Sequence, residues 1–135
     1  MNTGPKILVA DDDWEDRFLI SDSFKEIGYP DMISIVDDGE KVIEYLGKIQ
    51  DENQYPSLIV LDLNMPRLNG TETLRIIKNN LNYKNIRVII YSTSVNDNEK
   101  RECLKIGALS YITKPAKYSE SVSIAREFYQ VATTA

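Results

Sequence analysis

The sequence predicts an α/β protein, a three-layer sandwich in which helices cover both faces of a five-stranded parallel sheet. Strand-like apolar runs alternate with helix-like runs along the chain, and this alternation is typical of βαβ units. The runs at 58–61 and 88–91 are apolar at every position, as strands buried on both faces are. Right-handed crossovers then place helices on both faces, and the flavodoxin-like order 2-1-3-4-5 is the default for five such units.

The expected strands are five short runs bounded by polar or turn-forming residues. They cover residues 6–10, 33–37, 57–62, 86–92 and 109–113. The segments between and after them are expected to be helices. These cover residues 15–27, 39–49, 71–81, 97–106 and 119–131. Because no repeat, low-complexity tract or linker divides the chain, we expect one domain over residues 1–135, with no effector domain.

Apolar residues at helical spacing mark the buried face of three helices. They are Ile20, Phe24 and Ile27 in the first, Leu74, Ile77 and Leu81 in the third, and Ile124, Phe128 and Val131 in the fifth. Gly28 and Gly107 follow the first and fourth helices, where a C-terminal cap is expected. The polar connection 50–56 is longer than most. We interpret it as a surface loop, with a partner-contacting loop as the alternative.

Polar groups follow four of the expected strands at their C-terminal ends. Asp11 and Asp12 follow the first strand, Asp62 ends the third, Ser92 ends the fourth and Lys114 follows the fifth. In an open parallel sheet these ends lie along one edge, where ligands bind. The sequence therefore predicts that these side chains form one site.

The three carboxylates of this site favour a hard cation. Asp11, Asp12 and Asp62 would raise each other's pKa unless a cation joined them. Oxygen ligands without His or Cys select Mg²⁺ or Ca²⁺, and the cluster has too few oxygens for a closed calcium cage. Mg²⁺ would let a carboxylate nucleophile meet an incoming phosphoryl group. Lys114 and the Ser92 hydroxyl would then contact the phosphoryl oxygens.

Structural roles compete with this interpretation for each residue taken alone. An Asp after a strand is often the N-cap of the next helix. We assign that role to Asp13, with Asp16 three residues later forming a weaker version of a capping box. The occurrence of suitable groups at four separate strand ends favours a functional site over four unrelated structural roles.

Composition and charge exclude several classes of function. The chain has 135 residues and a net charge of −5, which does not favour nucleic acid, since phosphates attract clustered Lys and Arg. It contains one cysteine, Cys103, and no histidine, so an internal disulfide, an ordinary zinc site and a His-based triad are excluded. The N-terminal residues form neither a signal peptide nor a membrane span. We expect a cytoplasmic protein.

The chain resembles the receiver domain of bacterial two-component response regulators over essentially its whole length. The matching segments are Ile7-Leu-Val-Ala-Asp-Asp12, Leu58-Ile-Val-Leu-Asp-Leu-Asn-Met-Pro66 with Asn69-Gly70, Tyr91-Ser-Thr-Ser94 and Tyr111-Ile-Thr-Lys-Pro115. Each segment is weakly specific alone, and together, in order and at compatible spacing, they are highly specific. The fold that the resemblance implies is the flavodoxin-like one already expected.

The resemblance implies a phosphoacceptor and its metal ligands. Asp62 corresponds to the residue that takes a phosphoryl group from the phosphohistidine of a sensor histidine kinase. Asp11 and Asp12 correspond to the acidic pair that binds Mg²⁺, with Mn²⁺ as an alternative ion. The backbone carbonyl of Asn64 corresponds to a further ligand. The chain is then a phosphoacceptor that assists its own phosphorylation and dephosphorylation, rather than an enzyme.

The resemblance also implies how phosphorylation is transmitted. Ser92 corresponds to the switch hydroxyl that moves toward the phosphoryl group, and Lys114 to the ammonium that pairs with it. Tyr111 corresponds to an aromatic switch whose ring turns inward on activation. The bond between Lys114 and Pro115 corresponds to one that is cis in this family.

The sequence departs from the commonest receiver pattern at three positions. Thr93 stands where Ala is usual and is expected to narrow access to Asp62, and Ala116 stands where an aromatic residue is frequent. Trp14 adjoins the acidic cluster and is expected to shield the metal from solvent. The connection 50–56 and the Ser-Thr-Ser stretch resemble stand-alone receivers that partner phytochrome-type kinases.

Because the chain ends soon after its fifth helix, the expected output is a contact surface on the domain itself. The family's usual output surface here includes Tyr111, Lys117 and Tyr118, and it is read by a downstream protein that the sequence does not identify. Whether phosphorylation drives a homodimer is open. No direct nucleic-acid or membrane partner is expected.

Alternative functions remain from the same class and from others. The chain could pass its phosphoryl group to a histidine phosphotransfer partner, or act as a receiver-like scaffold without phosphate. A phosphohydrolase of the haloacid-dehalogenase type would need a second Asp where Asn64 stands. An FMN carrier would need a Ser/Thr/Gly-rich loop where the chain has three aspartates.

Overall fold

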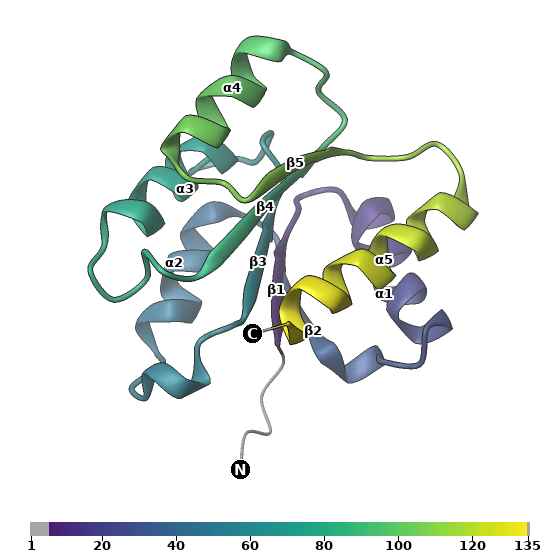
Figure 1. Cartoon of the computed structure of the whole chain (residues 1–135), viewed down its shortest axis with the longest axis horizontal. Coiled ribbons are helices and arrows are strands. Elements are labelled where there is room, and N and C mark those ends of the chain that lie inside the picture. The colour runs from purple at the N-terminus through teal and green to yellow at the C-terminus, as the bar shows by residue number, and fades with distance from the viewer. Residues whose placement is uncertain (1–5, 135) are drawn as a thin grey trace.

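The five strands form one parallel sheet in the predicted order β2-β1-β3-β4-β5. The computed structural model describes residues 6–134, and Figure 1 shows helices on both sides of the sheet. The strands are β1 (Ile7–Ala10), β2 (Ile33–Val36), β3 (Leu58–Leu61), β4 (Arg87–Ser92) and β5 (Ser110–Thr113). The fold class and strand order expected from the sequence are thus confirmed.

Five α-helices alternate with the strands. They are α1 (Trp14–Glu26), α2 (Gly39–Gly47), α3 (Gly70–Asn79), α4 (Asp97–Ile106) and α5 (Tyr118–Thr133). Helices α1 and α5 lie side by side on one face of the sheet, and α2, α3 and α4 cover the other (Figure 1). The first four begin at side-chain caps, Asp13, Asp38, Asn69 and Asn96, each accepting from backbone N–H groups of the first turn.

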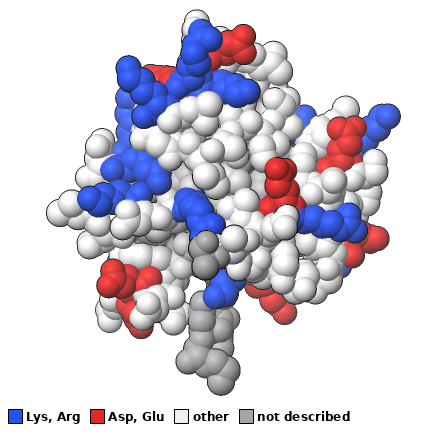
Figure 2. Space-filling view, viewed as in Figure 1, with Lys and Arg blue, Asp and Glu red and all other residues white. Residues whose placement is uncertain are grey.

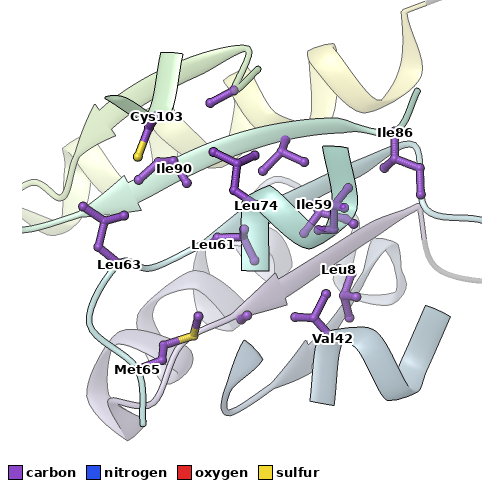
Figure 3. Close-up of a cluster of buried hydrophobic side chains, with 14 of the residues drawn as sticks. Leu8, Val42, Ile59, Leu61, Leu63, Met65, Leu74, Ile86, Ile90 and Cys103 are labelled. Carbon is purple, nitrogen blue, oxygen red and sulfur yellow. The ribbon is translucent and has the colours of Figure 1, made fainter. Parts of the chain in front are cut away.

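Two hydrophobic clusters hold these layers together, one on each face of the sheet. Successive strand residues alternate between them, since side chains in a strand point to opposite faces. Leu8, Ile59 and Ile90 belong to the cluster under α2, α3 and α4, much of which Figure 3 shows. Ile7 and Val60 belong to the cluster under α1 and α5. Strands buried on both faces explain the continuous apolar runs of the sequence.

The expected end of the third helix was wrong. We expected Leu81 on its buried face, but α3 ends at Asn79, and Leu81 is 82% exposed. Asn80 has extended backbone angles, and its side-chain oxygen accepts from the N–H of Asn82. Asn side chains stabilise such turns in competition with helix. The stops expected at Gly28 and Gly107 are confirmed, with φ angles of 89° and 134°.

The polar connection 50–56 is partly ordered by its own contacts. It contains a short 3-10 helix, η2 (Glu52–Gln54), whose N-cap Asp51 accepts from the N–H of Asn53. The ring of Tyr55 packs edge-on against Tyr83, with centroids 5.5 Å apart. These contacts fit the surface loop that we expected, while a role in partner contact stays untested.

Charge is unevenly distributed over the surface. Although the net charge is −5, Figure 2 shows Lys and Arg gathered over the region of α4 and α3. One face therefore carries a basic region despite the negative net charge of the whole chain. The expectation that the protein has no nucleic-acid partner stays a prediction. Over residues 6–134, none of the helices combines the length and apolar character that crossing a bilayer requires.

The loop between β3 and α3 packs closely against its surroundings. A Cβ at Gly70 would overlap the backbone oxygen of Asp62 and would lie 2.8 Å from the Cα of Leu63. Arg67 has a left-handed φ of 63°, and its guanidinium lies 3.4 Å from the buried carboxylate of Asp38. These contacts fix the loop that follows Asp62.

We predict that Gly70→Ala lowers the free energy of unfolding by about 1–3 kcal/mol, since the added methyl group forces backbone apart. Urea denaturation would measure it. Gly47→Ala is the matched control, because a Cβ there meets nothing within 4 Å. That change should leave stability equal or raise it by about 0.5–1 kcal/mol. Equal effects of the two substitutions would contradict the close packing at Gly70.

Candidate functional site

The predicted site residues come together at the C-terminal edge of the sheet. Asp11 follows β1, Asp62 follows β3, Ser92 ends β4 and Lys114 follows β5. Asp11 and Asp62 are only 4% and 7% exposed, and Ser92 is fully buried. Parallel pairing places these strand ends side by side. The strand order thus produces the convergence that the sequence predicted.

Lys114 is the centre of the charge network. Its Nζ donates to Asp11 Oδ2 at 2.6 Å, to Asp16 Oδ2 at 2.8 Å and to Asp62 Oδ2 at 3.1 Å. The Lys114 side chain is only 7% exposed. Its Nζ also lies 5.9 Å from the ring centroid of Tyr91, a favourable cation–π distance. The ammonium therefore balances carboxylates from three segments of the chain.

The role expected for Asp16 was wrong. Asp13 caps α1 as expected, accepting from the N–H groups of Glu15 and Asp16. The Asp16 carboxylate pairs with Lys114, however, and does not complete a capping box. Helical side chains lean toward the N-terminus of their helix, so a carboxylate in the first turn of α1 can reach the sheet edge. This direction of helical side chains could have predicted the contact of Asp16 with the site.

Arg17 is a residue of the site that the sequence did not predict. Its Nη1 donates to the backbone oxygen of Asp11 at 2.9 Å. The N–H of Asp13 donates to Asp11 Oδ1 at 2.9 Å. Together these bonds fix both the backbone and the carboxylate of Asp11. No motif in the sequence marked Arg17, because its contact is to a backbone atom.

The acidic cluster fits a divalent metal ion. Asp11, Asp12 and Asp62 offer carboxylate oxygens that lie within 4.8 Å of one another, and Asp12 is the exposed member. Hard oxygen donors of this kind suit Mg²⁺, Mn²⁺ or Ca²⁺. Asp12 and Asn64 line one open pocket of about 470 Å³, through which solvent and an ion can reach the cluster. The ligand role of the Asn64 carbonyl stays a prediction.

Burial and charge act in opposite directions on the groups of the site. Burial raises the pKa of Asp11 to about 6, although the Lys114 hydrogen bond and the Asp13 N–H oppose the rise. Burial would lower the pKa of Lys114, but the hydrogen bonds to Asp11 and Asp16 more than offset it, so this pKa is raised. Lys114 is therefore cationic, and its hydrogen bond to Asp11 stabilises the charged form of that carboxylate against burial.

Ser92 and Tyr111 are connected through Ser94. The N–H of Ser94 donates to Ser92 Oγ at 3.3 Å, and Tyr111 Oη donates to the backbone oxygen of Ser94 at 2.8 Å. The Tyr111 ring is half-buried and packs against the cluster under α4. Tyr118, which we placed on the output surface, turns its hydroxyl to Asp22 of α1 at 2.6 Å.

Two expectations for the surroundings of the site were wrong. Trp14 is 68% exposed and lines a cavity with Phe18 and Val36, whereas the pocket that holds Asp12 is lined by other residues. Trp14 is the first residue of α1 and lines a different pocket from Asp12. The bond between Lys114 and Pro115 is trans, as are all peptide bonds of the described residues; trans is the lower-energy form of an X–Pro bond. Thr93 and Ala116 are exposed, and the expected effect of Thr93 on access to Asp62 stays untested.

Fold and site together define a class of protein: a doubly wound α/β domain whose sheet edge holds a cluster of carboxylates suited to a divalent metal, a buried Lys and a buried hydroxyl. The family profile of the response regulator receiver domain matches residues 7–126. The chain therefore belongs to the receiver domain family, whose members act as phosphoacceptors in two-component signalling. Receiver domains are phosphorylated by sensor histidine kinases.

Relatives of known structure and function agree with this assignment. The phosphorylated cyanobacterial phytochrome response regulator RcpA is 30% identical, with a TM-score of 0.85 over 98% of this chain and 97% of that one. The Mn²⁺-bound response regulator Rcp1 is 26% identical, with a TM-score of 0.81 over 97% and 98%. Chemotaxis protein CheY1 of Helicobacter pylori is 30% identical over 82% of this chain and 85% of its own length. The likeness to phytochrome response regulators that the sequence suggested is thus confirmed.

We predict that Lys114→Met, without added divalent metal, lowers the free energy of unfolding by about 3–5 kcal/mol, because it leaves buried carboxylates unpaired. Chemical denaturation would measure it, and Mg²⁺ should restore part of the loss. The matched control is Lys117→Met, at an exposed position three residues along. Similar losses of unfolding free energy in both variants would show that the ion pairs of Lys114 do not stabilise the fold.

Proposed function

We propose that this chain accepts a phosphoryl group on the Asp62 carboxylate from the phosphohistidine of a sensor histidine kinase. The observation that carries the proposal is the contact of the Lys114 ammonium with Asp62 at 3.1 Å and Asp11 at 2.6 Å, where three carboxylates converge. A carboxylate can approach an anionic phosphoryl group only where positive charge offsets the repulsion. Lys114 supplies such a charge beside Asp62.

In the proposed transfer, a carboxylate oxygen of Asp62 attacks phosphorus. The new P–O bond forms while the P–N bond to the imidazole breaks, and the electron pair of that bond leaves with the imidazole nitrogen. Lys114 pairs with the phosphoryl oxygens, and the Ser92 hydroxyl donates to one of them. Phosphoryl transfer depends mainly on positioning and charge stabilisation, so these groups account for the chemistry without an enzyme's turnover machinery.

The metal of the proposed site is Mg²⁺, with Mn²⁺ as an alternative. Asp11, Asp12 and Asp62 would hold it, with the backbone carbonyl of Asn64 as a further ligand. When bound, the ion neutralises the carboxylates and the phosphoryl oxygens together. The oxygen-only donor set supports this choice, as does the Mn²⁺-bound form of the similar protein Rcp1.

The proposed output is a change of protein-interaction surface on this single domain. Ser92 and Tyr111 act as the switch residues, and α4, β5 and α5 present the surface, with Lys117 at its edge. A ligand shifts such an equilibrium only through different contacts in the two states. Three further points stay predictions. The partner kinase is of phytochrome type, by similarity to RcpA. The protein is cytoplasmic, and phosphorylation produces a homodimer.

The alternatives receive less support than the proposed role. A scaffold that never takes phosphate would not need Lys114, Asp11 and Asp62 in mutual contact within a buried site. Nothing in the site favours onward transfer to a second histidine over a switch. The family assignment leaves the phosphohydrolase and the FMN carrier without support.

Asp62→Asn should abolish phosphorylation while the fold is kept, because the amide is a poor nucleophile of nearly the same shape. Intact-mass spectrometry after incubation with a small phosphodonor and Mg²⁺ would show one phosphoryl adduct on the wild type only. Asp13→Asn is the matched control, since Asn caps a helix as well as Asp. It should still form the adduct. An adduct on Asp62→Asn at the normal rate would show that another residue is the acceptor.

Mg²⁺ should stabilise the folded protein, because it relieves carboxylate repulsion that only the folded state contains. At about 100 times its dissociation constant, the linkage amounts to roughly 2.7 kcal/mol. A thermal melt with and without millimolar Mg²⁺ would measure the shift, and Asp12→Asn should reduce it. A melting temperature independent of Mg²⁺ would argue against an assembled metal site.

A further inference from the structure

The loop between β4 and α4 is tied together by hydrogen bonds that converge on Ser94. Besides its bonds to Ser92 and Tyr111, Ser94 donates its hydroxyl to Glu99 Oε1 at 2.6 Å. The N–H of Asn96 donates weakly to the same hydroxyl at 3.4 Å. Ser94 therefore connects the buried hydroxyl of Ser92, the ring of Tyr111 and the first turn of α4.

The backbone of Glu99 is fixed in the first turn of α4. Its own N–H donates to the N-cap side chain of Asn96 at 3.1 Å. Helix α4 is anchored by the fully buried side chain of Cys103. A hydrogen bond to an ionised acceptor is among the stronger ones. Glu99 thus offers Ser94 a carboxylate acceptor on an anchored helical turn.

The bond from Ser94 to Ser92 leaves the Ser92 proton available. A hydroxyl has one donor hydrogen and two acceptor lone pairs. The Ser94 N–H occupies one lone pair of Ser92 Oγ, and this bond orients the hydroxyl without using its hydrogen. Any shift of Ser94 therefore changes the direction in which Ser92 can donate.

From this chain of contacts we propose that Glu99 is a positioning residue for phosphoryl transfer. It acts through the Ser94 hydroxyl to hold the Ser92 hydroxyl in its donating orientation, and it couples the first turn of α4 to the phosphorylation site. This inference rests on the proposed phosphoacceptor function. Glu99 also lines the pocket that contains Asp12 and Asn64, so its negative charge faces the entry of an anionic phosphodonor.

Two roles of Glu99 can be separated by comparing Ala with Gln. If Glu99 positions Ser94, Gln keeps an oxygen acceptor and retains most of the function, whereas Ala loses it. If Glu99 only repels the phosphodonor, both substitutions remove the charge and accelerate phosphorylation alike. The two roles therefore predict opposite signs for Glu99→Ala.

The test is the rate of adduct formation at saturating Mg²⁺ and a fixed, sub-saturating concentration of small phosphodonor, followed by intact mass. We expect Glu99→Ala and Ser94→Ala each to slow the reaction roughly three- to tenfold, the effect of one lost hydrogen bond. The double variant should be no slower than the slower single variant, because both changes break the same contact. Glu99→Gln should react within about twofold of the wild type, and Mg²⁺ affinity should be unchanged throughout.

Glu102→Ala is the matched control, since it removes a Glu of the same helix that pairs with Arg75 and not with Ser94. It should react at the wild-type rate. A Glu99→Ala rate equal to or above that of the wild type would overturn the inference and leave the phosphoacceptor role intact. Additive losses in the double variant would also overturn it. A wild type without any adduct would overturn both the proposed function and this inference.

Discussion

The convergence of carboxylates on one sheet edge is the constraint on which the rest of the site depends. Asp11 and Asp62 are buried, and such groups cannot remain charged side by side without compensation. Lys114 supplies one positive charge, and the exposed Asp12 leaves the cluster open to an external cation. The site is therefore short of positive charge. A phosphoryl group can join it only if further cationic charge arrives as well.

The register of the sheet determines which strand-end residues lie next to one another. Ala10 is paired with Leu61, and the N–H of Asp62 donates to the oxygen of Ala10 at 3.0 Å, so the acidic residues after β1 and β3 lie next to one another. The N–H of Lys114 donates to the oxygen of Ser92 at 2.9 Å. Backbone hydrogen bonds thus set the positions of these residues, and side-chain contacts set the orientations of their side chains. Gly70 also packs closely against the backbone of Asp62 and holds the loop after β3 in place.

The sequence predicted most of the fold and the main residues of the site, because both depend on patterns local to each strand. Alternating runs predicted the sheet, and polar residues at strand ends predicted Asp11, Asp62, Ser92 and Lys114. The missed features depend on tertiary geometry. The pairing of Asp16 with Lys114 joins residues far apart in the sequence, and Arg17 contacts a backbone oxygen. Leu81 fitted the helical spacing, but the Asn80 turn ended the helix before it.

The most direct test of the central claim is to locate the phosphoryl group chemically. An acyl phosphate is reduced by borohydride to an alcohol, so a phosphorylated Asp becomes homoserine, which peptide mass spectrometry identifies. After incubation with a phosphodonor and Mg²⁺, we predict homoserine at position 62 and unmodified Asp11 and Asp12. Homoserine at position 11 or 12 would contradict the account. So would a phosphoryl adduct elsewhere in the chain without any homoserine at position 62.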